Sequence, residues 1–390
     1  KFAKNLLINN LKGFLNYWEN FKMKIVITIN TTWNIYNFRL GLIKKLQKQG
    51  HRIFGIAPND EYVEKLKSEG VEFHHVSINA KSINPIEDLR LIRDYYIKFK
   101  KINPDIVLSY TIKPNIYATI ACGFLKIPII NNVSGLGTLF IKKSLSSYIA
   151  RFLYRFAFKY SYWTFFQNET DKENFEKLKL VSTKKTSLLP GSGVNLEKFV
   201  SKRITNSGKR FLFVGRLIGD KGIREFIKAA NKLSKENSLA EFLLVGELGY
   251  NNDTAISEQE LNTWLKNSQI KFLGKQDEVK EIYKKSDIMV LPSYREGLSK
   301  SLIEAAAMKL PIITTNVPGC REVVEENKNG FLCRVKDPAD LYEKMKKIIL
   351  LTEKQRLQMG NYSRQKAEKE FDEKIVISKY LYKIEELIKT

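Results

Sequence analysis

Short apolar runs alternate with longer amphipathic stretches along this chain. In the first half, the apolar runs predict buried strands at residues 23–27, 52–57, 73–76, 106–109, 128–133, 163–167 and 186–189. Helical spacing predicts helices between them at residues 41–49, 61–70 and 86–100. The polar and aromatic stretch 30–39 is expected to form a loop. Strands that alternate with helices indicate an α/β fold with a doubly wound parallel sheet.

The same alternation starts again after segment 190–193 and a polar linker at residues 201–207. Strands are expected at residues 211–214, 242–245, 271–273, 288–291 and 312–314. Helices are expected at residues 338–350, 353–371 and 373–389. With 390 residues, 43% of them hydrophobic, the chain can fill two cores. We therefore expect an N-terminal domain at residues 23–200 and a second domain at residues 201–372.

Residues 1–22 precede the first expected strand and are basic, aromatic and amphipathic. Met23 and the apolar run after it look like the start of a protein. Two interpretations stay open for residues 1–22. They form a helix at a membrane interface, or they are upstream sequence included by a misplaced start.

A turn between strand 288–291 and a helix expected at residues 299–308 lies at the carboxyl edge of the second sheet. Glu296 and Glu304 bracket it, with seven residues between them. Since Glu304 lies more than one helical turn further on, each carboxylate is expected to contact a different part of a ligand. The turn and the helix start offer Gly297 for close approach and N–H groups for a phosphate, near Leu298, Ser299 and Lys300. The alternative is two ordinary surface acids, one of them favoured by the helix dipole.

A glycine-rich loop follows strand 211–214, running from Gly215 to Gly222 and carrying Arg216 and Lys221. Glycines allow the backbone to approach a diphosphate, and the two cations neutralise its charge without a metal. The loop lacks the Gly-Lys-Ser/Thr of a P-loop and the acidic partner of a dinucleotide fingerprint. Neither an Asp-x-Asp pair nor a cluster with metal-ligand spacing occurs, so we expect no metal.

In its setting Pro-Ser-x-x-Glu-Gly-x6-Glu-Ala, the pair Glu296-x7-Glu304 resembles the nucleotide-sugar signature of glycosyltransferase family 4, a retaining family with the GT-B fold. The resemblance covers almost all of residues 23–390. It implies two Rossmann-like doubly wound domains that face each other across a cleft. It also implies that the final helix, at about residues 373–390, crosses back to the first domain, and that the donor is a UDP-sugar.

The resemblance assigns roles to individual residues. Arg216 and Lys221 match the family's diphosphate contacts, and Glu304 matches the contact to the nucleotide ribose. Glu296 matches the contact to the transferred sugar, close to the reacting carbon. Three further positions match segments that hold the base or line the donor site: Gly193, Gly215 and Lys275.

The first domain is expected to bind the acceptor. Ser134 and Gly135 lie in a glycine-rich stretch after strand 128–133, suited to a sugar or a phosphate. Lys113 in loop 109–115 and Arg39 after the first strand are candidates for the acceptor's diphosphate. For each cation the alternative is an ordinary solvated side chain.

The histidines depart from the family pattern. Many family 4 enzymes have a histidine near residues 132–138, but the three histidines here are His51, His74 and His75. His74 and His75 at a strand end are expected to be structural. We therefore expect a mechanism that relies on backbone groups and on the leaving group.

The charge of the chain favours anionic partners. It has 66 basic and 42 acidic residues, a net charge of +24, and no Asp or Glu between Ile106 and Asn168. Residues 141–163 combine aromatic side chains with lysines and arginines, as helices at a bilayer surface do. A buried helix with a basic solvent face is the alternative. No apolar run reaches the roughly 18 residues of a membrane span, and three widely spaced cysteines favour a reducing compartment.

The first-domain segments resemble those of bacterial N-acetylhexosaminyltransferases of surface-polysaccharide and N-glycan assembly. We expect sugar transfer from a UDP-sugar to a polyprenyl-diphosphate-linked saccharide, by a protein peripherally bound to the cytoplasmic face of an anionic membrane. One alternative is a soluble family 4 enzyme with a small acceptor. Another is a basic nucleic-acid-binding protein, which would explain the charge but not the glutamate pair. We expect no nucleic-acid partner.

Overall fold

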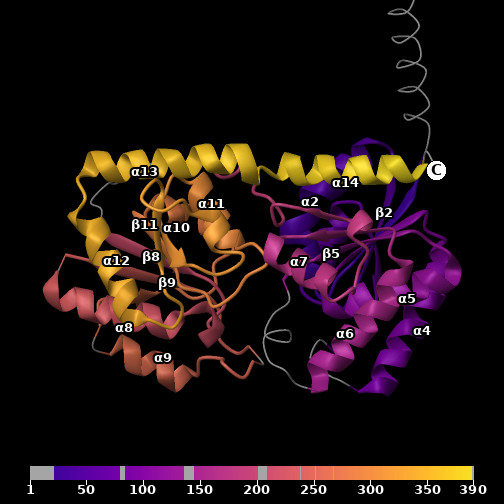
Figure 1. The fold of residues 1–390 in the computed structure, drawn as a ribbon, viewed down its shortest axis with the longest axis horizontal. Helices are drawn as coiled ribbons and strands as arrows, with labels where there is room; N and C mark the ends of the chain where they lie inside the picture. The colour runs from indigo at the N-terminus through magenta and orange to yellow at the C-terminus, as the bar shows by residue number, and fades with distance from the viewer. Residues whose placement is uncertain are drawn as a thin grey trace, which may run out of the picture. The chain divides into compact units, whose positions relative to one another are not determined.

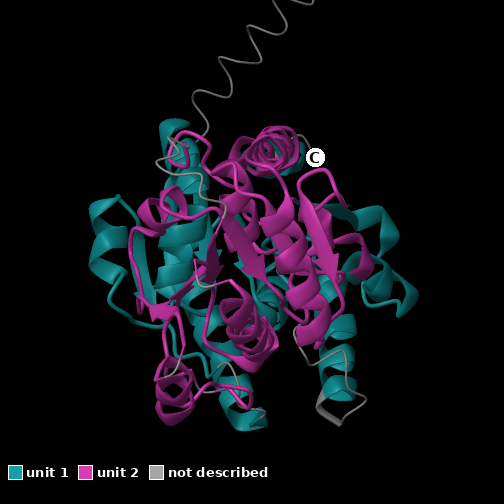
Figure 2. Ribbon diagram, turned by 90° about the vertical axis from the view of Figure 1, so that its left-hand side faces the viewer, with its two compact units in different colours: residues 1–167, 171–189, 377–390 teal, residues 168–170, 190–376 magenta. Residues whose placement is uncertain are grey.

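The computed structural model describes residues 22–79, 84–135, 145–200, 209–237, 239–250, 252–266 and 268–388. Residues 1–21, segment 136–144 and the linker 201–208 lie outside the described residues, and so do the expectations placed on them. By its internal contacts the chain divides into two compact units (Figure 2). Unit 1 comprises Lys1–Gln167, Asp171–Leu189 and Ile377–Thr390, and unit 2 comprises Asn168–Thr170 and Pro190–Val376.

Unit 1 contains a seven-stranded sheet in which every neighbouring pair is parallel, in the order β3-β2-β1-β4-β5-β6-β7. Its strands are β1 (Lys24–Thr28), β2 (Arg52–Ala57), β3 (Glu72–His75), β4 (Ile106–Tyr110), β5 (Ile129–Val133), β6 (Trp163–Phe166) and β7 (Thr186–Leu188). The helices along this half of the chain are α2 (Thr32–Lys48), α3 (Val63–Ser68), α4 (Pro85–Ile102), α5 (Ile112–Leu125), α6 (Leu145–Ala157) and α7 (Glu169–Lys177). In Figure 1, α4, α5 and α6 lie side by side, and α5 packs against both of the others.

The prediction of a loop at residues 30–39 is wrong, because most of this stretch forms the first half of α2. Thr31 caps the helix by accepting a hydrogen bond from the Asn34 amide at 3.2 Å. The buried positions Ile35, Arg39 and Leu42 then follow helical spacing. In the first half of α2, Ile35 is buried together with the polar residues Thr32 and Arg39. The hydrophobic pattern alone therefore does not reveal this part of the helix.

Unit 2 contains a six-stranded parallel sheet in the order β10-β9-β8-β11-β12-β13. Its strands are β8 (Arg210–Val214), β9 (Glu241–Val245), β10 (Ile270–Phe272), β11 (Ile288–Leu291), β12 (Ile312–Thr315) and β13 (Gly330–Cys333). Its helices include α8 (Ile223–Glu236), α9 (Glu258–Leu265), α10 (Val279–Lys284), α11 (Lys300–Ala307), α12 (Pro338–Leu350) and α13 (Glu353–Lys366). Together, the two parallel sheets with their helices confirm the predicted fold class.

Strand β13 was not expected, since the sequence analysis ended the second sheet at residue 314. A Cβ added at Gly330 would lie 1.8 Å from the carbonyl oxygen of Ile312, so only glycine allows β13 to pair this closely with β12. A four-residue strand that opens with glycine carries too little periodicity to be found from sequence.

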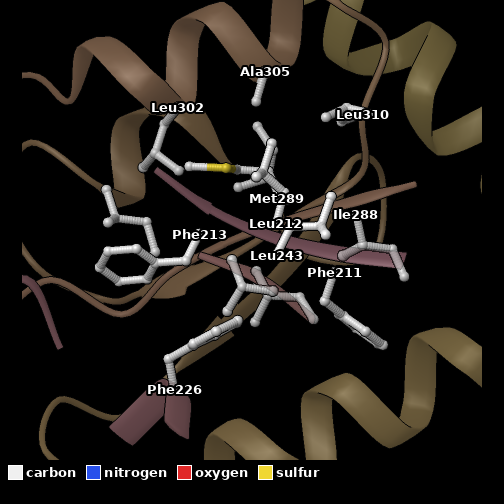
Figure 3. Close-up of a cluster of buried hydrophobic side chains, with 14 of the residues drawn as sticks. Phe211, Leu212, Phe213, Phe226, Leu243, Ile288, Met289, Leu302, Ala305 and Leu310 are labelled. Atoms are coloured by element: carbon white, nitrogen blue, oxygen red, sulfur yellow. The ribbon is translucent and has the colours of Figure 1, made fainter. Parts of the chain in front are cut away.

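The core of unit 2 lies on both faces of its sheet (Figure 3). Leu302 and Ala305 of α11 cover one face, and Phe226 of α8 packs against the other. Apolar strands buried on both faces are typical of parallel sheets. The carboxyl ends of these strands are therefore held in fixed positions, and the loops that follow them start from a rigid frame.

The last helix, α14 (Glu373–Ile388), continues from unit 2 into unit 1, as the resemblance implied. Its residues from Ile377 onward belong to unit 1, where Tyr380 is fully buried. Among the described residues, no helix combines the length and the apolar character needed to cross a bilayer.

Candidate active site

Two loops meet at the carboxyl edge of the unit 2 sheet, one after β8 and one after the neighbouring β11. The carbonyl oxygen of Asp220 accepts hydrogen bonds from the Tyr294 amide at 2.8 Å and the Ser293 hydroxyl at 3.1 Å. Gly222 has φ +72°, and an added Cβ would lie 2.0 Å from the Pro292 oxygen. Glycine is therefore required where the two loops touch.

Lys221 and Glu296 form an ion pair across this contact. Their side chains are 16% and 12% exposed, so the pair is mostly shielded from water. Losing either partner of a shielded pair is costly, so the two side chains hold each other in place. The arrangement places a cation suited to a phosphate directly beside a carboxylate suited to sugar hydroxyls.

The turn that carries Glu296 is also held by the loop after β12. The Glu296 amide donates to the Pro318 oxygen at 3.1 Å, and the Ser299 amide donates to the Gly319 oxygen at 2.9 Å. The Ser299 amide therefore already has an acceptor within the protein, contrary to the expectation that it binds a phosphate. Leu298 packs with its side chain against Gly191.

Glu304 lies one turn into α11 and is largely buried. Its carboxylate accepts a hydrogen bond from the Tyr283 hydroxyl at 3.3 Å, and the Lys300 ammonium lies 3.7 Å away. Burial raises the pKa of Glu304, while Lys300 and Tyr283 act in the opposite direction. Tyr283 is a second contact of this carboxylate that the sequence reasoning missed.

Gly193 lies against the start of α11. Its carbonyl oxygen accepts a hydrogen bond from the Lys300 ammonium at 2.6 Å. Gly193 has φ +69°, and an added Cβ would lie 2.4 Å from Cα of Glu373. The Glu373 carboxylate accepts from the Asn195 side chain at 2.7 Å. The structure thus brings Gly193, Lys300 and Glu304 together, and their role in one ligand site stays a prediction.

Arg216 and Lys275 belong to a second, more exposed group at the same sheet edge. The Arg216 guanidinium lies 5.7 Å from the centre of the Tyr250 ring. Tyr250 donates to Glu247 at 3.5 Å, and Lys275 lies 3.6 Å from the same carboxylate. The carbonyl oxygen of Gly215 packs closely against Gly246, where an added Cβ would lie 2.1 Å from it, so the contact requires glycine at position 246.

In unit 1 the two cations expected to bind the acceptor, Lys113 and Arg39, differ in their contacts. Lys113 lies in the first turn of α5, not in a loop, and pairs with Asp88 at 2.6 Å. Arg39 is 4% exposed and stacks over the Tyr110 ring at 4.1 Å. Its Nη1 donates to the Phe38 carbonyl at 3.3 Å, whereas its buried Nε has no acceptor. No carboxylate among the described residues forms an ion pair with Arg39.

Ser134 and Gly135 follow β5 directly, and Gly135 has φ +111°. His75 accepts a hydrogen bond from the Asn59 amide at 3.2 Å and His74 stacks on Phe54, so these histidines have structural contacts. Within the part of the chain that the structure describes, no three His, Cys, Asp or Glu side chains form a group that could hold a metal.

Sequence reasoning also missed Asn168. This buried side chain directly contacts the turn of Glu296, donating to the Gly297 carbonyl at 2.8 Å. The only signal in the sequence is its place just after the run 163–167, at the carboxyl end of an expected strand.

Comparison with known proteins supports a single family. The family model "Glycosyl transferase 4-like" matches residues 24–168, and "Glycosyl transferases group 1" matches residues 195–366. The chain is 29% identical over 385 residues to N,N'-diacetylbacillosaminyl-diphospho-undecaprenol alpha-1,3-N-acetylgalactosaminyltransferase of Campylobacter jejuni, covering 94% of this chain and 100% of the relative. It is 27% identical to UDP-Gal:alpha-D-GlcNAc-diphosphoundecaprenol alpha-1,3-galactosyltransferase of Escherichia coli, over 76% of this chain and 82% of that protein.

Solved structures share the fold. A glycosyltransferase from Rickettsia africae has a TM-score of 0.75 at 20% identity, covering 95% of this chain and 99% of its own. The Anabaena protein HepE, solved with UDP and glucose, has a TM-score of 0.78 at 14% identity, covering 93% and 100%. Both halves match family models of glycosyl transferases, and the resemblance is confirmed: this chain is a glycosyltransferase with the GT-B fold, similar to the 4-like model in its first half and to the group 1 model in its second half.

Proposed function

We propose that this enzyme transfers a sugar, an N-acetylhexosamine, from a UDP-sugar to a lipid-diphosphate-linked saccharide, with retention of configuration. The observation that carries the proposal is the shielded Lys221–Glu296 pair at the carboxyl edge of unit 2. The relatives from Campylobacter and Escherichia coli, whose names specify acceptors on diphospho-undecaprenol, support the acceptor class.

In unit 2, Lys221 and Arg216 contact the donor's diphosphate, and Glu304 accepts hydrogen bonds from the ribose hydroxyls. Glu296 contacts hydroxyls of the transferred sugar, beside the phosphate held by Lys221. Backbone at Gly193, Gly215 and Lys275 lines the nucleotide. The proximity of Lys221 and Glu296 supports this assignment, because sugar and diphosphate are joined by one bond.

The proposed chemistry needs no protein base. As the bond between the anomeric carbon and the phosphate oxygen breaks, negative charge develops on UDP. Lys221, Arg216 and the amides at the start of α11 stabilise that charge. The departing phosphate accepts the proton of the attacking acceptor hydroxyl on the same face, so the new bond keeps the donor's configuration.

We also propose that no metal takes part, since cations of the protein meet the diphosphate. Transfer is then expected to persist when EDTA is added to the purified enzyme. Loss of activity with EDTA, restored by a divalent cation, would contradict this part of the proposal.

On the acceptor side we propose Arg39 in preference to Lys113. The charge of Lys113 is neutralised by Asp88, whereas a buried guanidinium without a carboxylate is costly unless an anion binds it. The acceptor's diphosphate is such an anion. Ser134 and Gly135 are proposed to contact the acceptor as well.

We propose peripheral binding at the cytoplasmic face of an anionic membrane, through one side of α6 and the residues next to it. The exposed apolar side chains there are Phe124, Tyr148, Ile149, Phe152, Phe156 and Tyr160. An added Cβ at Gly123 would lie 2.5 Å from the Tyr160 ring, so Phe124 and Tyr160 belong to one surface. Exposed Lys126, Arg155 and Lys159 lie among them, and such cations favour anionic lipids.

The test is release of UDP from a panel of UDP-sugars, with and without a bacterial extract of polyprenyl-diphosphate-linked saccharides. The proposal predicts release with one donor, dependent on the lipid fraction. Turnover with a free sugar and no lipid would favour the small-acceptor enzyme. Salt-sensitive retention on nucleic acid without any UDP-dependent thermal shift would favour the nucleic-acid-binding protein.

A further inference from the structure

Asn168 is separated from Glu296 by 128 positions in the chain, yet both belong to unit 2. The Asn168 side chain is 2% exposed. Its Nδ2 donates to the carbonyl oxygen of Gly297 at 2.8 Å and, more weakly, to that of Glu296 at 3.4 Å. One side-chain amide therefore holds two consecutive carbonyl groups of the turn that carries Glu296.

These two contacts fix the direction of two other groups. In a trans peptide, the carbonyl of one residue and the N–H of the next point in opposite directions. Holding the carbonyls of Glu296 and Gly297 toward Asn168 therefore directs the N–H groups of Gly297 and Leu298 away from it. Among the described residues, neither N–H has an acceptor. Buried N–H groups without a protein acceptor need another partner, such as a water molecule or a ligand oxygen.

Segment 168–170, which carries Asn168, makes a second contact within unit 2. The hydroxyl of Thr170 accepts a hydrogen bond from the Arg321 side chain at 2.9 Å. Arg321 follows Gly319, whose carbonyl oxygen accepts from the Ser299 amide on the far side of the turn. The turn is thus held both by segment 168–170 and by the loop after β12.

We infer that Asn168 is a positioning residue of the donor site, which orients the N–H groups of Gly297 and Leu298 toward the sugar diphosphate through the two carbonyls it holds. This inference rests on the proposed function for the identity of the ligand. Asn168 acts through the backbone and has no role in proton transfer.

The decisive variant is Asn168→Asp, which keeps the shape but replaces the donor by a carboxylate that repels both carbonyl oxygens. We expect kcat to fall about 100-fold, the size of the effect of a small misplacement or of a weakened charge-stabilising contact. The affinity for UDP is expected to change less than about threefold, because Lys221 and Glu304 are untouched. The kcat of Asn168→Ser, which retains one donor, is expected to lie between that of Asn168→Asp and that of the wild type.

Thr170→Val is the matched control, because it removes the other attachment of the same segment and leaves Asn168 intact. We expect its kcat to stay within about twofold of wild type. A kcat of Asn168→Asp equal to that of Thr170→Val would overturn the inference. So would a loss of kcat in Asn168→Asp that is matched by equal losses of UDP affinity and thermal stability, since that pattern indicates a merely structural role.

Amide hydrogen exchange tests the same inference without any turnover. The amides of Glu296 and Ser299 are protected by the Pro318 and Gly319 carbonyls only while the turn keeps its conformation. They are expected to exchange faster in Asn168→Asp than in Thr170→Val. Equal exchange in both variants would contradict the role of Asn168. Faster exchange in an enzyme that uses no UDP-sugar would leave that role standing and refute the proposed function instead.

Discussion

Lys221 and Glu296 are paired in the structure, yet we assign them to different parts of the donor. Removing Lys221 would take away the proposed charge-assisted contact to the diphosphate and leave the Glu296 carboxylate unpaired beside it. Removing Glu296 instead frees the ammonium for the phosphate. The two substitutions should therefore differ in their effect on UDP binding, although both reduce transfer.

Lys221→Ala is expected to weaken UDP binding about 10- to 100-fold, which corresponds to about 1.5–3 kcal/mol for a hydrogen bond to a charged group. Glu296→Ala is expected to lower transfer by about 100-fold or more while UDP binds as tightly as before or more tightly. Calorimetric titration with UDP and a transfer assay on the same preparations separate the two effects. An equal loss of UDP affinity in both variants would refute this division of roles.

Glu304 gives a pH dependence with a defined sign. Because burial raises its pKa, acidification protonates this carboxylate at a higher pH than an ordinary glutamate. Affinity for UDP is therefore expected to fall on acidification before ordinary glutamates titrate, and Glu304→Gln should remove this step. UDP titrations at several pH values measure it, and an unchanged pH profile in Glu304→Gln would contradict the assignment.

The same burial has a consequence for stability. A glutamate whose folded pKa is raised destabilises the fold once it is ionised, so stability falls as pH rises through its unfolded pKa and up to its folded pKa. Glu304→Gln is therefore expected to melt at or above the wild-type temperature at pH 7, although it binds UDP more weakly. A lower melting temperature would mean that Glu304 serves the fold and not the ligand.

The position of several candidate site residues at one sheet edge was predictable from the sequence, because their spacing is local. Glu296, Glu304 and Lys221 follow strands or lie on one helix, and parallel strands end at one edge. The sequence does not reveal which of these groups are already bonded. The Ser299 amide donates to the Gly319 carbonyl, and Lys113 forms an ion pair with Asp88. Asn168 contacts the turn of Glu296 although it lies 128 positions away in the chain.

At the scale of elements, the loop after β12 supports the Glu296 turn through a backbone contact that only glycine allows. Gly319 has φ +81°, and an added Cβ would lie 2.4 Å from the Glu296 oxygen. Gly249 has the same φ, but an added Cβ would meet nothing within 4 Å. An alanine would adopt the same unfavourable backbone conformation at both positions, but its Cβ would clash only at position 319.

Gly249→Ala is expected to cost about 1–3 kcal/mol, the strain of a left-handed non-glycine residue, with transfer by the folded enzyme unchanged. Gly319→Ala should cost more, and it should lower transfer as well because the Glu296 turn must move. Denaturant unfolding and transfer assays of the two variants check this. Similar transfer in both would show that the turn does not depend on this contact.

The second prediction for an element concerns α6. Phe152→Ser combined with Phe156→Ser removes two exposed apolar side chains of its proposed membrane face. Binding to vesicles with anionic lipid is expected to weaken, whereas transfer to a short-chain, detergent-free acceptor analogue stays at the wild-type level. Leu350→Ser, an exposed apolar residue of α12 in unit 2, is the control. Equal vesicle binding by all three proteins would contradict the proposed surface.

The elements themselves were predicted well where the apolar pattern is strong, and less well where polar residues or glycine form the element. Strands 52–57 and 288–291 were placed at their observed bounds. Helix α2 was cut short because its first turns bury few apolar residues, and β13 was missed because it is short and begins with glycine. Such cases are decided by tertiary packing, which overrides local propensity.

At the scale of the whole molecule, α14 begins in unit 2 and belongs to unit 1 from Ile377 onward. Tyr380 is buried in unit 1, where its hydroxyl accepts a hydrogen bond from Asn132 at 3.0 Å. Tyr382 on the same helix is exposed. Tyr380→Ala is expected to lose about 3–5 kcal/mol, as for other large aromatic side chains, without changing the affinity for UDP.

Tyr382→Ala is expected to change the free energy of unfolding by no more than about 0.5 kcal/mol. Denaturant unfolding and UDP titration of both variants provide the comparison. If Tyr380→Ala weakened UDP binding in a preparation that is still folded, the nucleotide site could not lie within unit 2 alone.

In the proposed mechanism, the leaving diphosphate is held by Lys221 and Arg216 and takes the acceptor's proton on the face where the new bond forms. Once the panel of UDP-sugars has identified the donor, proton NMR of the product gives the anomeric configuration of the new linkage. We expect the configuration that the sugar has in the donor. An inverted linkage would contradict it, because attack from the opposite face requires a protein base that this mechanism does not contain.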